Sequence, residues 1–162
     1  MPSPLIMVVE DDPVCALDVL ATLRKIGYPD TLSARSGEEA LALASNRRPD
    51  LFIMDIVLDG ELDGIETARR LRSIVDAPVI YLTSNKDADF FERAKITDPF
   101  GYLFKPVKRD ELRNSVALAL FKSGLEKRLK ESERRLYTTL RSIADAVVST
   151  DAQGDWWGGA GG

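Results

Sequence analysis

The sequence predicts an α/β fold: a doubly wound parallel sheet of five strands in the order 2-1-3-4-5, with helices on both faces and an extended C-terminal helix. Short continuous apolar runs alternate with segments of helical periodicity over residues 1–121. Continuous apolar runs are typical of strands that are covered on both faces, as in parallel sheets. Right-handed crossovers then distribute the helices over both sides of such a sheet.

Runs of apolar residues predict the five strands. Four strongly apolar runs span residues 5–9, 51–54, 78–82 and 101–104, and Thr31 to Ala34 forms a shorter, more polar one. Each strong run leads into a polar residue. Because the carboxyl ends of parallel strands share one edge of the sheet, and ligands bind there in open α/β folds, we expect a functional site at that edge.

Apolar residues at intervals of three and four predict the helices. The first is expected over residues 14–26, the more polar fourth over 86–96, and the fifth from near Val107. The apolar face of the first helix is predicted to comprise Val14, Leu17, Leu20, Ala21 and Leu23.

Capping boxes mark the starts of the second and third helices. Ser36 stands three residues before Glu39, and Asp63 three residues before Glu66. In such a box the first side chain accepts a hydrogen bond from the backbone of the fourth residue, which satisfies a donor that the helix leaves open.

The fifth helix has no clear stop, because no proline occurs over residues 112–144. Its apolar residues follow a roughly heptad spacing: Leu125, Leu129, Leu136, Leu140 and Ile143. The polar residues Ser132 and Thr139 break this pattern. This pattern fits a solvated tail helix or a parallel coiled coil that makes the chain a homodimer through the 112–144 helix. We favour the coiled coil.

Three parts are expected along the chain: a domain over residues 1–121, a helical or coiled-coil linker over 122–142, and the truncated start of a further domain with a disordered tail over 143–162. Residues 142–155 predict a helix end, a short strand and a turn. Too few residues follow to complete a domain, so we expect a fragment of a longer protein.

Composition limits the function classes. The net charge of −4 and the pI near 5.0 argue against direct nucleic-acid binding by this chain. A single cysteine and the lack of a signal or membrane segment fit a cytoplasmic protein. The chain has no histidine, so a phosphohistidine donor would have to be another protein or domain.

The strand-end acids predict a divalent metal site. Glu10, Asp11 and Asp55 would repel one another at adjacent strand ends unless a cation neutralised them. Mg²⁺ prefers oxygen ligands and takes one or two carboxylates, with Mn²⁺ as an alternative. Asp11 and Asp55 suit direct ligation, Glu10 could act through water, and the backbone carbonyl of Val57 could add a ligand.

The same edge could handle a phosphoryl group. A carboxylate such as Asp55 can attack phosphorus to form an aspartyl phosphate. Catalysis then consists mainly of positioning and charge neutralisation. The ammonium of Lys105 and the hydroxyl of Thr83, both at ends of neighbouring strands, could hold two of the phosphoryl oxygens.

Residues 5–121 resemble a receiver domain of two-component response regulators. The resemblance rests on Val8-Val9-Glu10-Asp11-Asp12, Met54-Asp55-Ile56, Leu82-Thr83-Ser84 and Phe104-Lys105-Pro106. It implies that Asp55 is the phospho-acceptor, that Glu10 and Asp11 form the acidic metal pair, and that Lys105 contacts phosphate. It also implies a switch formed by Thr83 and Tyr102, and a cis bond before Pro106.

The resemblance further implies a partner and an output. A histidine kinase or phosphotransfer protein would donate the phosphoryl group, and the surface of the fourth helix, fifth strand and fifth helix would respond. Residues 140–154 are similar to the opening of a PAS domain. A histidine kinase or cyclic-di-nucleotide synthase usually follows in such fusions, while this chain itself is not expected to be an enzyme acting on other substrates.

Three alternative functions use some of the same residues. A haloacid-dehalogenase-type phosphatase needs a second acid two residues after its nucleophile, where this chain has Val57. A non-phosphorylated interaction module and a nucleic-acid-binding regulator with its effector further along remain open. One departure from many receivers is a longer acidic loop, Asp59-Gly60-Glu61, which delays Asp63-Gly64 by one residue.

Overall fold

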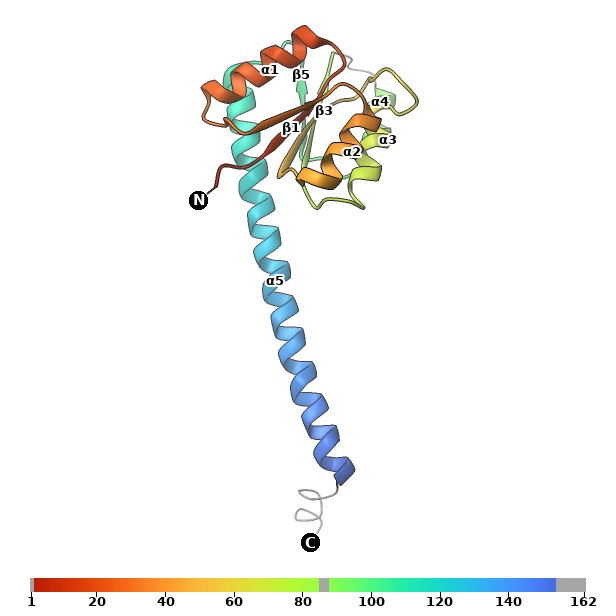
Figure 1. The fold of residues 1–162 in the computed structure, drawn as a ribbon, viewed down its shortest axis with the longest axis vertical. Helices are drawn as coiled ribbons and strands as arrows, with labels where there is room; N and C mark the ends of the chain where they lie inside the picture. The colour runs from red at the N-terminus through yellow and green to blue at the C-terminus, as the bar shows by residue number, and fades with distance from the viewer. Residues whose placement is uncertain (1, 85–87, 154–162) are drawn as a thin grey trace. The chain divides into compact units, whose positions relative to one another are not determined.

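A computed structural model of the chain describes residues 2–84 and 88–153. Its parallel sheet has the order β2-β1-β3-β4-β5, which confirms the predicted topology (Figure 1). The strands are β1 (Ile6–Val9), β2 (Thr31–Ala34), β3 (Leu51–Asp55), β4 (Val79–Thr83) and β5 (Gly101–Phe104). All five were predicted, with bounds that differ by at most one residue.

Five helices alternate with these strands. They are α1 (Pro13–Lys25), α2 (Gly37–Arg47), α3 (Gly64–Leu71), α4 (Ala88–Lys95) and α5 (Arg109–Gln153). The chain divides into two compact units, Met1–Ser123 and Gly124–Gly162, so α5 contributes its first part to one unit and the rest to the other. No described helix is long and apolar enough to cross a membrane.

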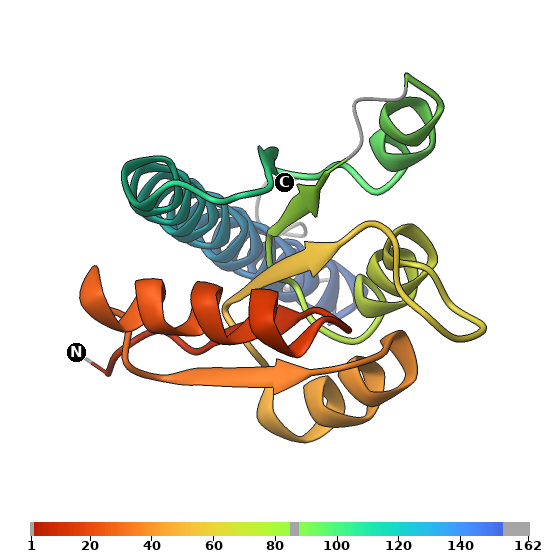
Figure 2. The same cartoon turned by 90° about the horizontal axis from the view of Figure 1, so that it is seen from above.

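The sheet carries a separate apolar core on each face. Helices α2, α3 and α4 cover one face, and α1 and the first part of α5 cover the other (Figure 2). The central strands β1, β3 and β4 consist entirely of buried residues. Burial on both faces is the physical reason that these strands read as continuous apolar runs in the sequence.

The buried face of α1 differs in part from the prediction. Val14 and Leu17 are exposed, and Ala16 and Val19 face the core in their place. Leu23 is buried, as predicted. Apolar residues occur around most of this helix, so two different stripes satisfy helical spacing. The position of the helix on the sheet, which the spacing alone does not contain, decides between them.

Both predicted helix caps are present. The backbone N–H of Glu39 donates to Ser36 Oγ at 3.1 Å, and that of Glu66 donates to Asp63 Oδ1 at 2.8 Å. The Glu39 carboxylate accepts a hydrogen bond from the backbone N–H of Arg35, whereas Glu66 pairs with neighbouring arginines on its own helix.

The second unit is helical where a strand was predicted. Helix α5 continues to Gln153, so the expected helix end and short strand within 142–155 are wrong as far as the structure describes them. A helix satisfies its backbone hydrogen bonds internally, whereas a strand needs a neighbouring strand. The predicted disordered tail, from Trp156 onward, lies outside the described residues. The assignment of 143–162 to a further domain stays a prediction.

Candidate functional site

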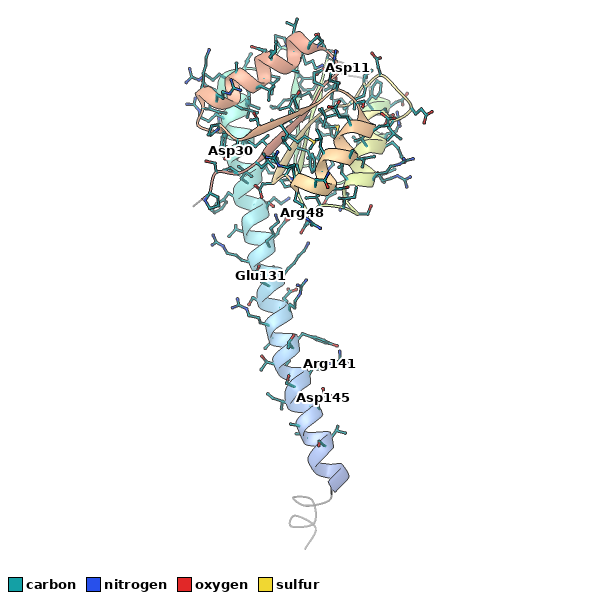
Figure 3. All side chains as sticks on the ribbon, viewed as in Figure 1. Asp11, Asp30, Arg48, Glu131, Arg141 and Asp145 are labelled. Atoms are coloured by element: carbon teal, nitrogen blue, oxygen red, sulfur yellow. The ribbon has the colours of Figure 1, made fainter. Side chains whose placement is uncertain are left out.

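The carboxyl edge of the sheet gathers three carboxylates. Val9 pairs with Met54 in the sheet, so the residues that follow them, Glu10 and Asp55, emerge side by side. One carboxylate oxygen from each of Glu10, Asp11 and Asp55 lies within 4.8 Å of the others. Figure 3 shows Asp11 at this edge, and Asp30 and Arg48 at the opposite edge where β2 and β3 begin.

Lys105 brings a positive charge to this cluster. Its backbone N–H donates to the carbonyl of Thr83 at 2.9 Å, which fixes the residue just beyond β5. Its Nζ donates to Asp55 Oδ2 at 2.8 Å and lies 2.7 Å from Glu10 Oε2. The contact with Glu10 is an ion pair without hydrogen-bond alignment. Lys105 therefore bridges the ends of β1, β3 and β5.

Backbone donors hold the other carboxylate oxygens. The N–H of Val57 donates to Asp55 Oδ1 at 3.0 Å, and that of Asp12 donates to Glu10 Oε1 at 3.1 Å. The N–H of Asp59 donates to Asp11 Oδ2 at 3.1 Å. A backbone N–H therefore orients each of the three carboxylates. These neutral donors fix the side chains without adding charge.

Burial weakens Glu10 as an acid. Only 1% of its surface is exposed, and this burial raises its pKa to about 7, against the opposing effect of the Lys105 ammonium. The neighbouring Asp55 carboxylate adds to the increase. A further cation placed beside such a carboxyl would strongly favour its ionised form.

Asp11 and Lys105 are shifted toward their charged forms. Partial burial acts to raise the pKa of Asp11, but the contact with the Glu10 carboxyl and the hydrogen bond from the Asp59 backbone N–H outweigh burial, so the pKa falls below its usual range. Burial would lower the pKa of Lys105, but its hydrogen bond to Asp55 and its ion pair with Glu10 raise that pKa above the ordinary value.

The donor set fits a magnesium ion. With all three acids ionised, three negative charges and the one ammonium of Lys105 leave a net charge of −2. Among the described residues Glu10 Oε2 is a buried oxygen that accepts no hydrogen bond. Oxygen donors of this kind, close together and in charge excess, are what Mg²⁺ prefers, and nothing in the set favours Mn²⁺ over it.

Thr83 and Tyr102 lie on β4, the neighbour of β3, and on β5, the strand beyond it. Thr83 is 2% exposed at the end of β4 and sits next to Phe104 in the sheet register. The half-buried ring of Tyr102 on β5 stacks on Tyr81 at 5.9 Å and meets the edge of Phe91 from α4 at 4.8 Å. The Lys105–Pro106 peptide bond is cis, as expected.

A glycine supports the backbone of Asp55. A Cβ on Gly64 would lie 1.9 Å from the carbonyl oxygen of Asp55, so the first turn of α3 rests directly on the end of β3. The N–H of Gly64 also donates to the carbonyl of Ile56 at 2.8 Å. Only glycine permits so close an approach between the helix and the strand.

Sequence reasoning missed three contacts around the site. It gave the acidic loop no structural role, yet the Asp59 backbone holds Asp11. The cap residue Asp63 also accepts from Arg93 of α4 at 2.6 Å, and the Tyr81 hydroxyl meets Thr97 Oγ1 at 2.6 Å beyond α4. The one-residue delay of Asp63-Gly64 was the only signal in the sequence that pointed to the loop.

Comparisons with known proteins agree on the family. The sequence matches the profile described as the response regulator receiver domain over residues 6–117. The transcriptional regulatory protein PdtaR of Mycobacterium tuberculosis is 34% identical over 115 residues, which are 71% of this chain and 56% of PdtaR. The match thus spans about half of the length of that relative.

Solved structures give the same result. The signal receiver domain of a modulated diguanylate cyclase from Desulfovibrio desulfuricans G20 has a TM-score of 0.74 and 42% identity, covering 77% of this chain and 99% of that one. The receiver domain of the sensor histidine kinase PA1611 from Pseudomonas aeruginosa PAO1, with magnesium coordinated in its active site cleft, has a TM-score of 0.67 and 31% identity, covering 74% and 98%. The chain belongs to the response regulator receiver family of two-component signalling.

Proposed function

We propose that this chain is a phospho-accepting receiver whose Asp55 takes a phosphoryl group in the presence of Mg²⁺. The observation that carries the proposal is the bridge made by Lys105, which lies 2.8 Å from Asp55 Oδ2 and 2.7 Å from Glu10 Oε2. An ammonium held between an acceptor carboxylate and a buried acid is placed to contact a phosphoryl group attached to that acceptor.

The metal ligands are drawn from the acidic cluster. Asp11 and Asp55 would bind the ion directly, Glu10 directly or through water, and the Val57 backbone carbonyl would add a fourth oxygen. A bound Mg²⁺ would supply charge neutralisation for a phosphoryl group at this edge. The net charge of −2 on the ionised cluster and the buried Glu10 oxygen support this assignment.

Phosphoryl transfer needs little chemistry from the chain beyond positioning. An Asp55 oxygen forms a bond to phosphorus while the bond from phosphorus to the donor nitrogen breaks, and the electron pair of that bond stays on the nitrogen. Lys105 would move from the carboxylate to the new phosphoryl oxygens, and the buried Thr83 hydroxyl would donate to another of them. Tyr102 would then change its packing against Tyr81 and Phe91, which alters the α4-β5-α5 surface.

The phosphodonor and the output are both expected outside this chain. Receiver domains take phosphate from histidine kinases or phosphotransfer proteins, and the chain has no histidine of its own. A homodimer through α5 and a C-terminal output, a PAS module with a histidine kinase or cyclic-di-nucleotide synthase, complete the proposal. The similarity to the receiver of a diguanylate cyclase favours the synthase. This chain itself would act as a non-catalytic signalling domain.

A non-phosphorylated interaction module is the competing function. It would be favoured if the acidic pair or the lysine were displaced from Asp55, and both lie beside it. A nucleic-acid-binding regulator remains a second alternative for the longer protein, because PdtaR is described as a transcriptional regulatory protein.

Intact mass spectrometry with a small phosphodonor tests the proposal. After incubation with acetyl phosphate and Mg²⁺, the wild-type chain is expected to gain about 80 Da, the mass of one phosphoryl group. Asp55→Asn should not gain this mass, because an amide is not a nucleophile toward phosphorus. Chelating the metal with EDTA should abolish the gain in the wild type.

Asp59→Asn is the matched control for Asp55→Asn. It makes the same change of side chain four residues away, and the backbone N–H that Asp59 donates to Asp11 is retained. The control should be phosphorylated like the wild type. Absence of the added mass in the wild type, together with no binding of beryllofluoride, would replace the proposal by the interaction module.

A further inference from the structure

The second unit has an apolar stripe that is exposed to solvent. Its large side chains, between 47% and 61% exposed in the described chain, are Leu125, Leu129, Leu136, Leu140 and Ile143. A row of large exposed apolar side chains along one helix is typical of an interaction site. Most of the stability of a helix in water comes from covering such a stripe, so the segment needs a partner.

The stripe follows a coiled-coil seam. Alternating steps of four and three residues lead from Leu125 through five further positions: Leu129, Ser132, Leu136, Thr139 and Ile143. In heptad notation the positions of type a hold Leu129, Leu136 and Ile143. The positions of type d hold Leu125, Ser132 and Thr139. The two small polar residues in the seam weaken it without interrupting the spacing.

Charges on the two sides of the seam have opposite signs. Glu126 and Glu133 occupy e positions, and Arg128 and Arg135 occupy g positions. The labelled charges Glu131, Arg141 and Asp145 fall at outer positions of the same register (Figure 3). The e and g residues flank the partner helix in a coiled coil and set its orientation.

This pattern distinguishes the two possible orientations. In a parallel pair, a g residue faces the e residue of the next heptad in the other copy, so Arg128 faces Glu133. In an antiparallel pair centred on this stretch, g faces g and e faces e, which sets arginine against arginine and glutamate against glutamate. Like charges in such contacts oppose association.

We infer that residues 125–143 form a parallel, in-register two-stranded coiled coil with a second copy of this chain. The inference rests on the homodimer of the proposed function and deepens it. It narrows the interface to these residues, fixes the register and names the charges that favour the parallel orientation. The residues that follow Ile143 in the two copies would then lie side by side.

Disulfide cross-linking tests orientation and register. The full chain carrying Cys15→Ser has no other cysteine. Into it we would introduce Ser132→Cys or Thr139→Cys separately, and each variant would be treated with glutathione disulfide. In a parallel in-register pair both positions meet their own copies, so both variants should cross-link efficiently. The two positions lie about 10 Å apart along the helix. In an antiparallel pair whose centre lies at residue 132, the two copies of residue 139 would be about 20 Å apart, and the same holds with the two positions exchanged. A disulfide cannot span that distance.

Thr138→Cys is the matched control, because it changes the same residue type one position away on the outer face. It should cross-link weakly. Cross-linking at only one of the two seam positions, or equal cross-linking at Thr138 and Thr139, would overturn the inference. A monomeric or trimeric mass by light scattering for the unmodified chain would overturn it as well.

Charge exchange tests the orientation independently. Glu133→Lys places like charges opposite Arg128 in both symmetric contacts and should weaken the dimer roughly tenfold. Adding Arg128→Glu restores opposite charges and should recover most of the affinity. Failure of the double variant to recover would contradict the parallel arrangement.

The two proposals fail in distinguishable ways. All cross-linking is measured without phosphodonor, and also with Asp55→Asn, which should cross-link like the wild type. Loss of the phosphoryl mass with intact cross-linking would refute phospho-acceptance alone. Normal phosphorylation of a chain that does not cross-link would refute the coiled coil alone.

Discussion

Helices α4 and α5 flank β5 on opposite faces of the sheet, and different kinds of contact attach them. The first part of α5 is anchored by Leu112, Val116 and Ala119, each fully buried. Among the side chains described for α4, only Ala94 is fully buried. Besides the ring contact of Phe91 with Tyr102, polar contacts attach α4: Asp63 with Arg93, and Tyr81 with Thr97 just beyond the helix. Because a few directed contacts can be exchanged for others more easily than a buried apolar stripe, we expect α4 rather than α5 to respond to the site.

The largest expected effect is the loss of an α5 anchor. Leu112→Ala removes a fully buried side chain and should lower the free energy of unfolding by about 2–5 kcal/mol. Leu118→Ala, on the exposed side of the same helix, should change it by less than about 0.5 kcal/mol. Urea unfolding at one fixed protein concentration would measure both. Equal effects would show that α5 is not anchored by its buried stripe.

Alkaline pH should act on the attachment of α4 through Tyr81. Burial raises the pKa of Tyr81 to about 12, and the hydrogen bond with Thr97 opposes this only in part. The folded state therefore favours the neutral phenol. That stabilisation is complete below pH 10 and is lost as the pH rises from about 10 to 12, by on the order of 2 kcal/mol.

Tyr81→Phe is the control for this pH dependence. The variant lacks the titrating group, so its stability should fall less steeply between pH 10 and 12 than that of the wild type. At pH 7 it should cost about 1 kcal/mol, because Thr97 Oγ1 keeps its bond to the carbonyl of Ala94. Parallel pH profiles for the two proteins would contradict the assignment.

Two changes at Asp63 separate its roles. Asp63→Ala removes both the cap of α3 and the ion pair with Arg93, and should cost about 1–2 kcal/mol. Asp63→Asn keeps a good cap residue and removes only the charge pair. Amide hydrogen exchange should then rise in α4 and stay unchanged in α5.

The smallest expected effect is that of Arg93→Gln. The pair with Asp63 is about half exposed on the arginine side, so its loss should cost less than about 1 kcal/mol and should matter less at high salt. A salt-independent loss would mean that Arg93 acts through packing. In either case the cost should be well below that of Leu112→Ala.

The strand ends were predictable because they depend on residue type and order. Each apolar run leads into the group that the site uses, and parallel register brings Glu10, Asp55 and Lys105 together. The role of the acidic loop was not predictable, because the Asp59 contact uses a backbone N–H that every residue except proline possesses. The buried face of α1 was not predictable because tertiary packing selects between two apolar stripes.

Gly64 has a mechanical consequence for the acceptor. Because α3 rests on the Asp55 carbonyl without an intervening side chain, the backbone of the acceptor has a stiff support on that side. A change of charge on the side chain then does little work on its own peptide. We therefore expect a change of charge on Asp55 to displace the Lys105 ammonium and the strand end at Thr83 more than the backbone of Asp55 itself.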